Sequence, residues 1–135
     1  MSVQLNHTIV FCRDQRRSAS FFTRILGLPA PTRFGHFLVV QTANGVSLDF
    51  DETQDAIVRG HYAFLVGEDD FDHIFGRIRD QGLAYWADPG RTLSGQTYTH
   101  NGGRGMYFDD PDGHLLEILT RPYGSGGFRP VRSEV

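Results

Sequence analysis

Glu117 is a carboxylate in the middle of an otherwise apolar, strand-forming run, residues 114–120. The turn before this run, residues 110–113, has Asp first, Pro second and Gly fourth, which favours a type I turn and makes the stretch from Tyr107 a hairpin. A carboxylate in such a strand is costly unless a cation, a metal or a functional cavity lies beside it. Glu117 is therefore the first candidate for chemistry.

Two histidines and a second acid occupy matching places in an internal repeat. His7 begins the β-rich segment of the first half and His61 begins that of the second. Asp49 stands on the closing strand of the first half, where Glu117 stands in the second. A longer loop before Arg104 accounts for the unequal spacing. If the halves pack side by side, these four side chains converge near the axis that relates them.

Two imidazoles and one carboxylate form a ligand set for a divalent metal. The set suits non-haem Fe(II) with open coordination positions, and Mn is equally preferred, while Zn, Ni and Co are compatible. His7, His61 and Glu117 are the expected ligands. Asp49 is open between a fourth ligand, a residue that supports the ligands and a solvated side chain.

Each half reads as strand, helix and three further strands. In the first, Asp14 precedes an apolar stripe at helical spacing, and Gly27 followed by Pro29 ends the helix. In the second, Gly82 closes a helix, and a long polar loop runs over residues 88–104. We therefore predict an α+β fold of two βαβββ modules, 1–57 and 58–121, that form one domain with a concave mixed sheet. Residues 122–135 are expected to be a flexible tail.

The composition excludes several classes of function. The chain has 135 residues and a formal net charge of −3, which gives no reason to expect a nucleic-acid partner. All 13 basic residues are Arg, so no mechanism that needs a lysine base or Schiff base applies. The chain has no apolar run long enough to cross a membrane, no signal-peptide pattern and one cysteine, Cys12, so we expect a cytoplasmic protein without disulfides.

The chain resembles the vicinal-oxygen-chelate superfamily, which includes glyoxalase I, extradiol dioxygenases, fosfomycin-resistance enzymes and bleomycin-binding proteins. The likeness covers residues 5–121 and is carried by the segments around His7, the first helix, the segment 60–64 and the hairpin 107–117. It implies the glyoxalase/dioxygenase-like fold, with paired modules that form a metal-binding cup, and His7, His61 and Glu117 as ligands, with Asp49 at an optional fourth position. It also implies a homodimer that acts on a small-molecule substrate.

Within that superfamily, residues 100–117 look like the extradiol dioxygenase signature, with Tyr98 as a departure where a small or aliphatic residue is usual. The resemblance implies that Tyr107 hydrogen-bonds a metal-bound catecholate and that His100 is a nearby acid–base group, while Glu117 joins them in catalysis. The best interpretation is an extradiol-type ring-cleavage dioxygenase for an oxygen-chelating substrate. Strand position alone predicts a pocket wall of Phe11, Phe37, Phe50 and Trp86.

Two alternatives stay open. One is a glyoxalase-type lyase or isomerase, in which the carboxylate is both ligand and base. The other is a non-catalytic binding protein of the bleomycin-resistance type. The absence of lysine argues against the fosfomycin branch.

Overall fold

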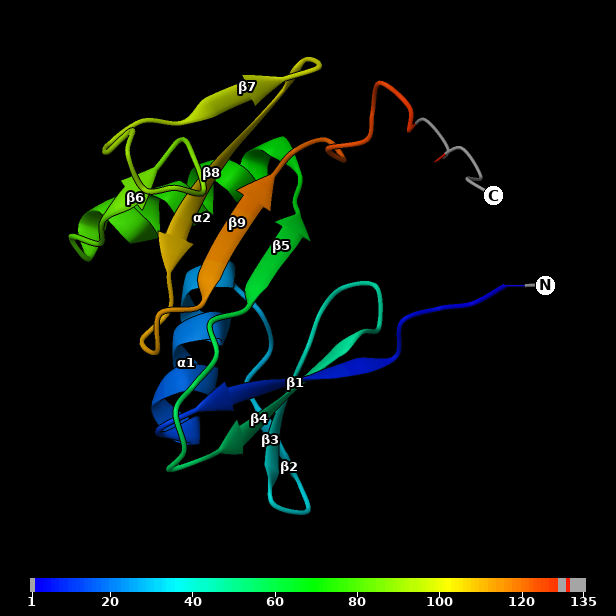
Figure 1. Cartoon of the computed structure of the whole chain (residues 1–135), viewed down its shortest axis with the longest axis vertical. Helices are drawn as coiled ribbons and strands as arrows, with labels where there is room; N and C mark the ends of the chain where they lie inside the picture. The colour runs from blue at the N-terminus through cyan, green and yellow to red at the C-terminus, as the bar shows by residue number, and fades with distance from the viewer. Residues whose placement is uncertain (1, 129–130, 132–135) are drawn as a thin grey trace.

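Two βαβββ modules follow one another in the chain, as predicted (Figure 1). The structure is a computed structural model that describes residues 2–128 and residue 131. The elements of the first module are β1 (His7–Cys12), α1 (Gln15–Leu26), β2 (Thr32–Phe34), β3 (Phe37–Gln41) and β4 (Ser47–Glu52). Those of the second are β5 (His61–Leu65), α2 (Glu68–Asp80), β6 (Tyr85–Trp86), β7 (Tyr98–His100), β8 (Gly103–Asp109) and β9 (Leu115–Leu119).

The ends of helix α1 follow the sequence signals. Asp14 adopts an extended conformation, and its side chain accepts hydrogen bonds from the backbone N–H groups of Arg16 and Arg17. These are donors that the first turn of a helix leaves without partners. Gly27 ends the helix with φ at 72°, in the left-handed region that glycine enters at low cost.

Each module forms its own mixed sheet. The first has the strand order β1-β4-β3-β2 and the second β5-β9-β8-β6, with β7 paired to β8. The pairings β1–β4 and β5–β9 are parallel and the others antiparallel. Strands β1 and β5 therefore lie at the ends of their sheets, each with one edge that no strand of the same sheet covers.

One strand differs from the sequence expectation. The stretch 88–104 was expected to be a loop, but Tyr98–His100 form the strand β7 and pair with Gly105 to Gly103 of β8. The surrounding sequence hides it, because the short strand-forming run Thr97, Tyr98 and Thr99 stands between polar residues and glycines. The difference matters, because β7 carries Tyr98 to the site described below.

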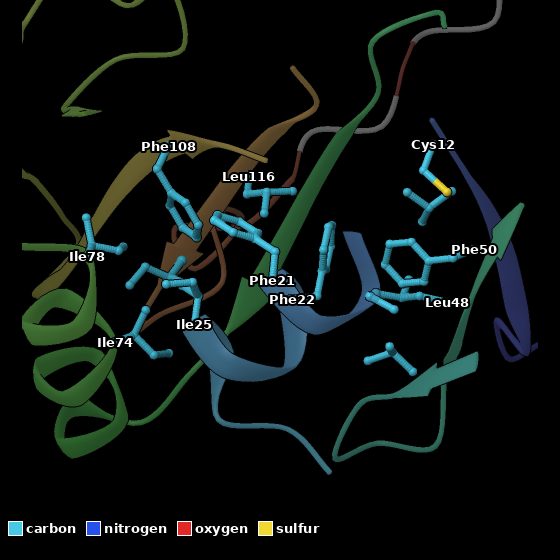
Figure 2. Close-up of a cluster of buried hydrophobic side chains, with 14 of the residues drawn as sticks. Cys12, Phe21, Phe22, Ile25, Leu48, Phe50, Ile74, Ile78, Phe108 and Leu116 are labelled. Atoms are coloured by element: carbon cyan, nitrogen blue, oxygen red, sulfur yellow. The ribbon is translucent and has the colours of Figure 1, made fainter. Parts of the chain in front are cut away.

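Helix α1 joins the cores of the two modules (Figure 2). The ring of Phe22 lies 4.9 Å from that of Phe50 in the first module and 6.3 Å from that of Phe64 in the second. Phe21 lies 6.4 Å from Phe108. The buried residues of both modules consequently form one continuous core. Among the described residues, no helix is long and apolar enough to span a bilayer.

The tail was expected to be flexible. Residues 122–128 form turns, with hydrogen bonds from Ser125 N–H to Pro122 and from Gly127 N–H to Gly124. The last part of the tail, residues 129–130 and 132–135, lies outside the described residues.

Candidate functional site

His61 and Glu117 meet on the face of the second sheet that points away from the helices. Along β5 and β9, the residues that alternate with them (Tyr62, Leu116 and Ile118) face the core. The Nε2 atom of His61 lies 3.2 Å from Oε1 of Glu117. The histidine side chain is 47% exposed and the carboxylate 9% exposed, so the pair opens to solvent on the imidazole side.

The other ring nitrogen fixes how His61 faces the carboxylate. Nδ1 lies 3.0 Å from the carbonyl oxygen of Leu115, which only accepts, so Nδ1 carries the proton and donates. The Nε2 atom therefore points at the oxygen of Glu117 and offers it either a proton or, without one, a lone pair. Two electron-pair donors that face each other need a cation between or beside them, either a proton or a metal ion. A histidine that donates one N–H to a carbonyl and offers the other nitrogen is the usual arrangement of a metal ligand.

Two tyrosines surround the same carboxylate. The hydroxyl of Tyr98 donates to Oε2 of Glu117 at 2.5 Å. The ring of Tyr107 lies 5.9 Å from that of His61 and 5.8 Å from that of Tyr98. Burial, followed by the hydrogen bond to Glu117 and its charge, raises the pKa of Tyr98. Burial and the charge of Glu117 raise the pKa of Tyr107 to about 12. Both phenols therefore stay protonated at neutral pH and can donate hydrogen bonds.

The first sheet carries the other two predicted ligands. His7 is exposed on β1, and its Nδ1 lies 2.7 Å from Oδ1 of Asn6. Asp49 is buried on β4 and pairs in register with Ile9 and Val39. Within residues 2–128 and residue 131, no three histidine, cysteine or carboxylate side chains of the chain come close enough to hold a metal ion. One chain thus brings together His61 and Glu117, but not the whole predicted set.

The predicted pocket wall divides between three places. Phe11 and Phe37 lie on the outer face of the first sheet, and Trp86 pairs with Tyr107 on the outer face of the second. Phe50 is fully buried against Phe22, so its assignment to the pocket wall is wrong and it belongs to the core. Strand alternation is the reason, because Phe50 follows the outward-facing Asp49 and must point into the core.

An arginine lies beside Trp86 and carries its own counter-charge. The Arg91 guanidinium lies 5.8 Å from the centre of the Trp86 ring. Its Nη2 is 2.6 Å from Oδ1 of Asp109, and its Nε is 3.2 Å from each oxygen of the same carboxylate. The hydrogen bond to Asp109 outweighs burial and raises the pKa of Arg91. The cation is therefore neutralised locally, and the wall next to Tyr107 is aromatic rather than positively charged.

His100 contacts the tail instead of Glu117. Its Nε2 lies 2.9 Å from the carbonyl oxygen of Tyr123 and 3.2 Å from the side-chain nitrogen of Asn101. The contact with Glu117 comes from Tyr98, two residues earlier on the same strand. In the sequence, Tyr98 stands out only as a departure from the dioxygenase signature. The signal that identifies it is the pairing of a large aromatic at 98 with a glycine at 105.

Comparison with known proteins defines the family. Residues 4–118 match the model of the Glyoxalase/Bleomycin resistance protein/Dioxygenase superfamily, and the chain belongs to this superfamily. The predicted α+β fold and the family resemblance are both confirmed.

Several relatives stand out. The chain is 58% identical to the solved structure of Oxidase ChaP-H1, with a TM-score of 0.90 over 92% of this chain and 100% of that one. For Oxidase ChaP-H2 the identity is 59% and the TM-score 0.90, over 94% and 100% of the two chains. The Glutathione transferase FosA of Serratia marcescens is 30% identical over 125 residues, 87% of this chain and 81% of that one.

Proposed function

We propose that the protein is a divalent-metal-dependent enzyme in which His7, His61 and Glu117 hold the ion. The observation that carries the proposal is the contact between the His61 Nε2 atom and the Glu117 carboxylate, which lie 3.2 Å apart. The Nδ1 atom of the same ring is hydrogen-bonded to a carbonyl oxygen. Nitrogen and carboxylate donors suit Fe(II) or Mn(II), and Zn, Ni and Co are alternatives. A bound ion would supply Lewis acidity toward a chelating substrate and, as Fe(II), redox chemistry with O2.

The third ligand comes from a second copy of the chain in this proposal. Strands β1 and β5 each end a sheet, and exposed sheet edges favour pairing with another chain. Apolar side chains stand exposed along both strands, Ile9 at 39% and Leu65 at 61%. In a twofold dimer, β1 of one copy would run beside β5 of the other. This pairing would place His7 of one copy beside His61 and Glu117 of the other copy, and the twofold symmetry would create two such sites.

A groove along β5 supports this pairing. Its volume is about 690 Å³. All the residues 61–67 line it, together with Leu5, Thr8 and Leu28 of the same chain. Because consecutive residues of β5 line it, the groove follows the strand's edge and not one of its faces. An edge with apolar surroundings suits a strand from a second copy.

The substrate that fits best is a small aromatic compound with two adjacent oxygens, and the reaction is an oxidation by O2. Trp86, Tyr98 and Tyr107 supply flat aromatic surfaces, and the phenol of Tyr107 would donate a hydrogen bond to an oxygen atom of the substrate. Two relatives that are nearly 60% identical bear the name oxidase. Extradiol-type ring cleavage, our interpretation of the sequence, is the narrower form of this proposal. Tyr107 would orient the substrate oxygen, and Asp49 would support the ligands from the first sheet.

A second candidate is thiol transfer to a small electrophile, favoured by the 30% identity to a glutathione transferase. The side chains in contact with Glu117 are phenol and imidazole, and the neighbouring arginine is occupied by Asp109. None of these groups offers a free cation to a strongly anionic substrate, so we rank thiol transfer second. Glyoxalase-type isomerisation, with Glu117 as base, is a further version of the same metal site.

The test combines metal content with O2 consumption. Protein purified without oxygen should hold about one divalent ion per chain, and catechol-like diols should drive O2 uptake, with coloured products if the ring is cleaved. His61→Ala and Glu117→Gln should abolish both, whereas His73→Ala, an exposed residue of α2, should change neither. Protein that stays metal-free after reconstitution with Fe(II) and Mn(II) would contradict the proposal. Glutathione consumption without O2 uptake would select the second candidate.

A further inference from the structure

The two oxygen atoms of Glu117 have different partners. Oε1 faces Nε2 of His61 at 3.2 Å, while Oε2 accepts the hydroxyl of Tyr98 at 2.5 Å. A hydrogen bond to a charged acceptor is shorter and about twice as strong as one between neutral groups. The carboxylate therefore has one oxygen held by the protein and one directed at the exposed histidine.

Tyr98 reaches Glu117 by lying across β8. Tyr98 pairs in register with Gly105, and Glu117 on β9 pairs with Tyr107, two residues further along β8. A Cβ atom built on Gly105 would lie 2.2 Å from the Tyr98 ring and hydroxyl. No real Cβ tolerates such a contact, so the glycine leaves the path of the ring open. The aromatic residue at 98 and the glycine at 105 work as a matched pair.

The position of the Tyr98 hydroxyl allows it one role, that of a hydrogen-bond donor to Glu117. The hydroxyl lies 2.5 Å from Oε2 of a carboxylate, which can only accept, so the phenol is the donor in this hydrogen bond. Glu117 is itself nearly buried, at 7% exposed, so few water molecules compete for Oε2. The contact therefore determines which carboxylate oxygen faces His61.

We infer that Tyr98 is a positioning residue that makes Glu117 a ligand through one oxygen only. The inference rests on the proposed metal site. With Oε2 held by Tyr98, Oε1 alone is free for the ion beside His61. A carboxylate released from Tyr98 could turn and bind through both oxygens, which would occupy a coordination position that a chelating substrate needs. Hydrogen-bonded partners of ligands typically change metal affinity by about 10–100-fold when they are lost.

The experiment uses the full-length protein loaded with Co(II), whose visible absorption reports the number and arrangement of ligands. Tyr98→Phe keeps the ring and removes the hydroxyl. It should alter the Co(II) spectrum and change the Co(II) dissociation constant by about 10–100-fold. Tyr85→Phe is the matched control, since Tyr85 packs against Phe75 on the core side, and it should leave both properties as in the wild type. Gly105→Ala should reproduce the Tyr98→Phe spectrum by displacing the ring.

The outcomes separate the two proposals. A wild-type protein that binds no Co(II) overturns the metal site and, with it, the role of Tyr98. A wild-type protein that binds Co(II), with an unchanged spectrum and affinity in Tyr98→Phe, overturns the positioning role alone. An effect of Gly105→Ala without an effect of Tyr98→Phe would also overturn it, because the cause would then be the added methyl group. Equal melting temperatures of the Tyr98→Phe and wild-type apoproteins show that the spectrum reports the ligand and not the fold.

Discussion

The Nε2 atom of His114 lies 2.7 Å from the carbonyl oxygen of Phe11, a residue of the other module. The Nδ1 atom of the same ring accepts a hydrogen bond from Gly60 N–H at 2.8 Å. The two contacts fix the tautomer, because a ring nitrogen that accepts from N–H must leave the proton on the other nitrogen. This histidine, 1% exposed, thus ties the end of β1 to the start of β5 from inside the second module.

We predict that His114→Ala destabilises the protein by leaving these two backbone groups unpaired. Each buried group without a partner costs about 1–3 kcal/mol. Urea unfolding should show a loss in this range or somewhat above it, whereas His73→Ala on the exposed face of α2 should change the free energy of unfolding little. Equal stabilities of His114→Ala and the wild type would show that the bridge between the modules contributes nothing.

The hairpin turn also holds a buried carboxylate, Asp110. Its Oδ1 accepts from the backbone of Asp112 and His114, but its Oδ2 has no partner among the described residues. Burial raises the pKa of Asp110 above its ordinary value of 3.8. Since the folded-state pKa is the higher one, the charged form favours unfolding, and the stability contributed by Asp110 falls as the pH rises above 3.8.

We predict that Asp110→Asn removes this pH-dependent loss. The stability of the variant relative to the wild type should be greatest near neutral pH, where the wild-type carboxyl is charged, and should shrink as the pH falls toward 3.8, the ordinary pKa of the group. The measurement is the urea midpoint of both proteins across this range. A difference that stays constant with pH would contradict the raised pKa.

Cys12 is predicted to be chemically inert in the folded protein. The residue is fully buried, and burial, followed by the charges of Asp112 and Glu52, raises the pKa of its thiol to about 12. At about pH 8, roughly one thiol in ten thousand is ionised, and the thiolate is the reactive form. Iodoacetamide should label Cys12 very slowly in buffer and readily in urea. Labelling of the native protein at the unfolded rate would contradict the prediction.

Local sequence signals predicted most of the fold. Asp14 and Gly27 predicted the ends of α1, and the internal repeat predicted the two modules. The repeat also indicated Glu117 and His61, which the structure places within contact distance. These signals succeed because caps, turns and strand periodicity depend on neighbours in the chain.

Long-range contacts were harder to predict. His114 directly follows a turn, and its neighbours in the chain do not indicate that its partner is Phe11, which is far away in the sequence. Tyr98 stood in a glycine-rich stretch, so its strand and its bond to Glu117 were missed. Phe50 was assigned to the pocket because its apolar side chain suits either face of a strand, and only packing against Phe22 decides between them.

The central claim is that each metal site combines ligands from two chains, and a doubly tagged heterodimer tests it most directly. One chain carries His7→Ala and the other His61→Ala, and the mixed dimer is purified through both tags. Each variant alone should hold no ion. The heterodimer should hold about half the wild-type content, because symmetry leaves one of its two sites intact. Pairing His61→Ala with Glu117→Gln is the matched control and should restore nothing. A His7→Ala homodimer with full metal content, or a first heterodimer with none, would contradict the claim.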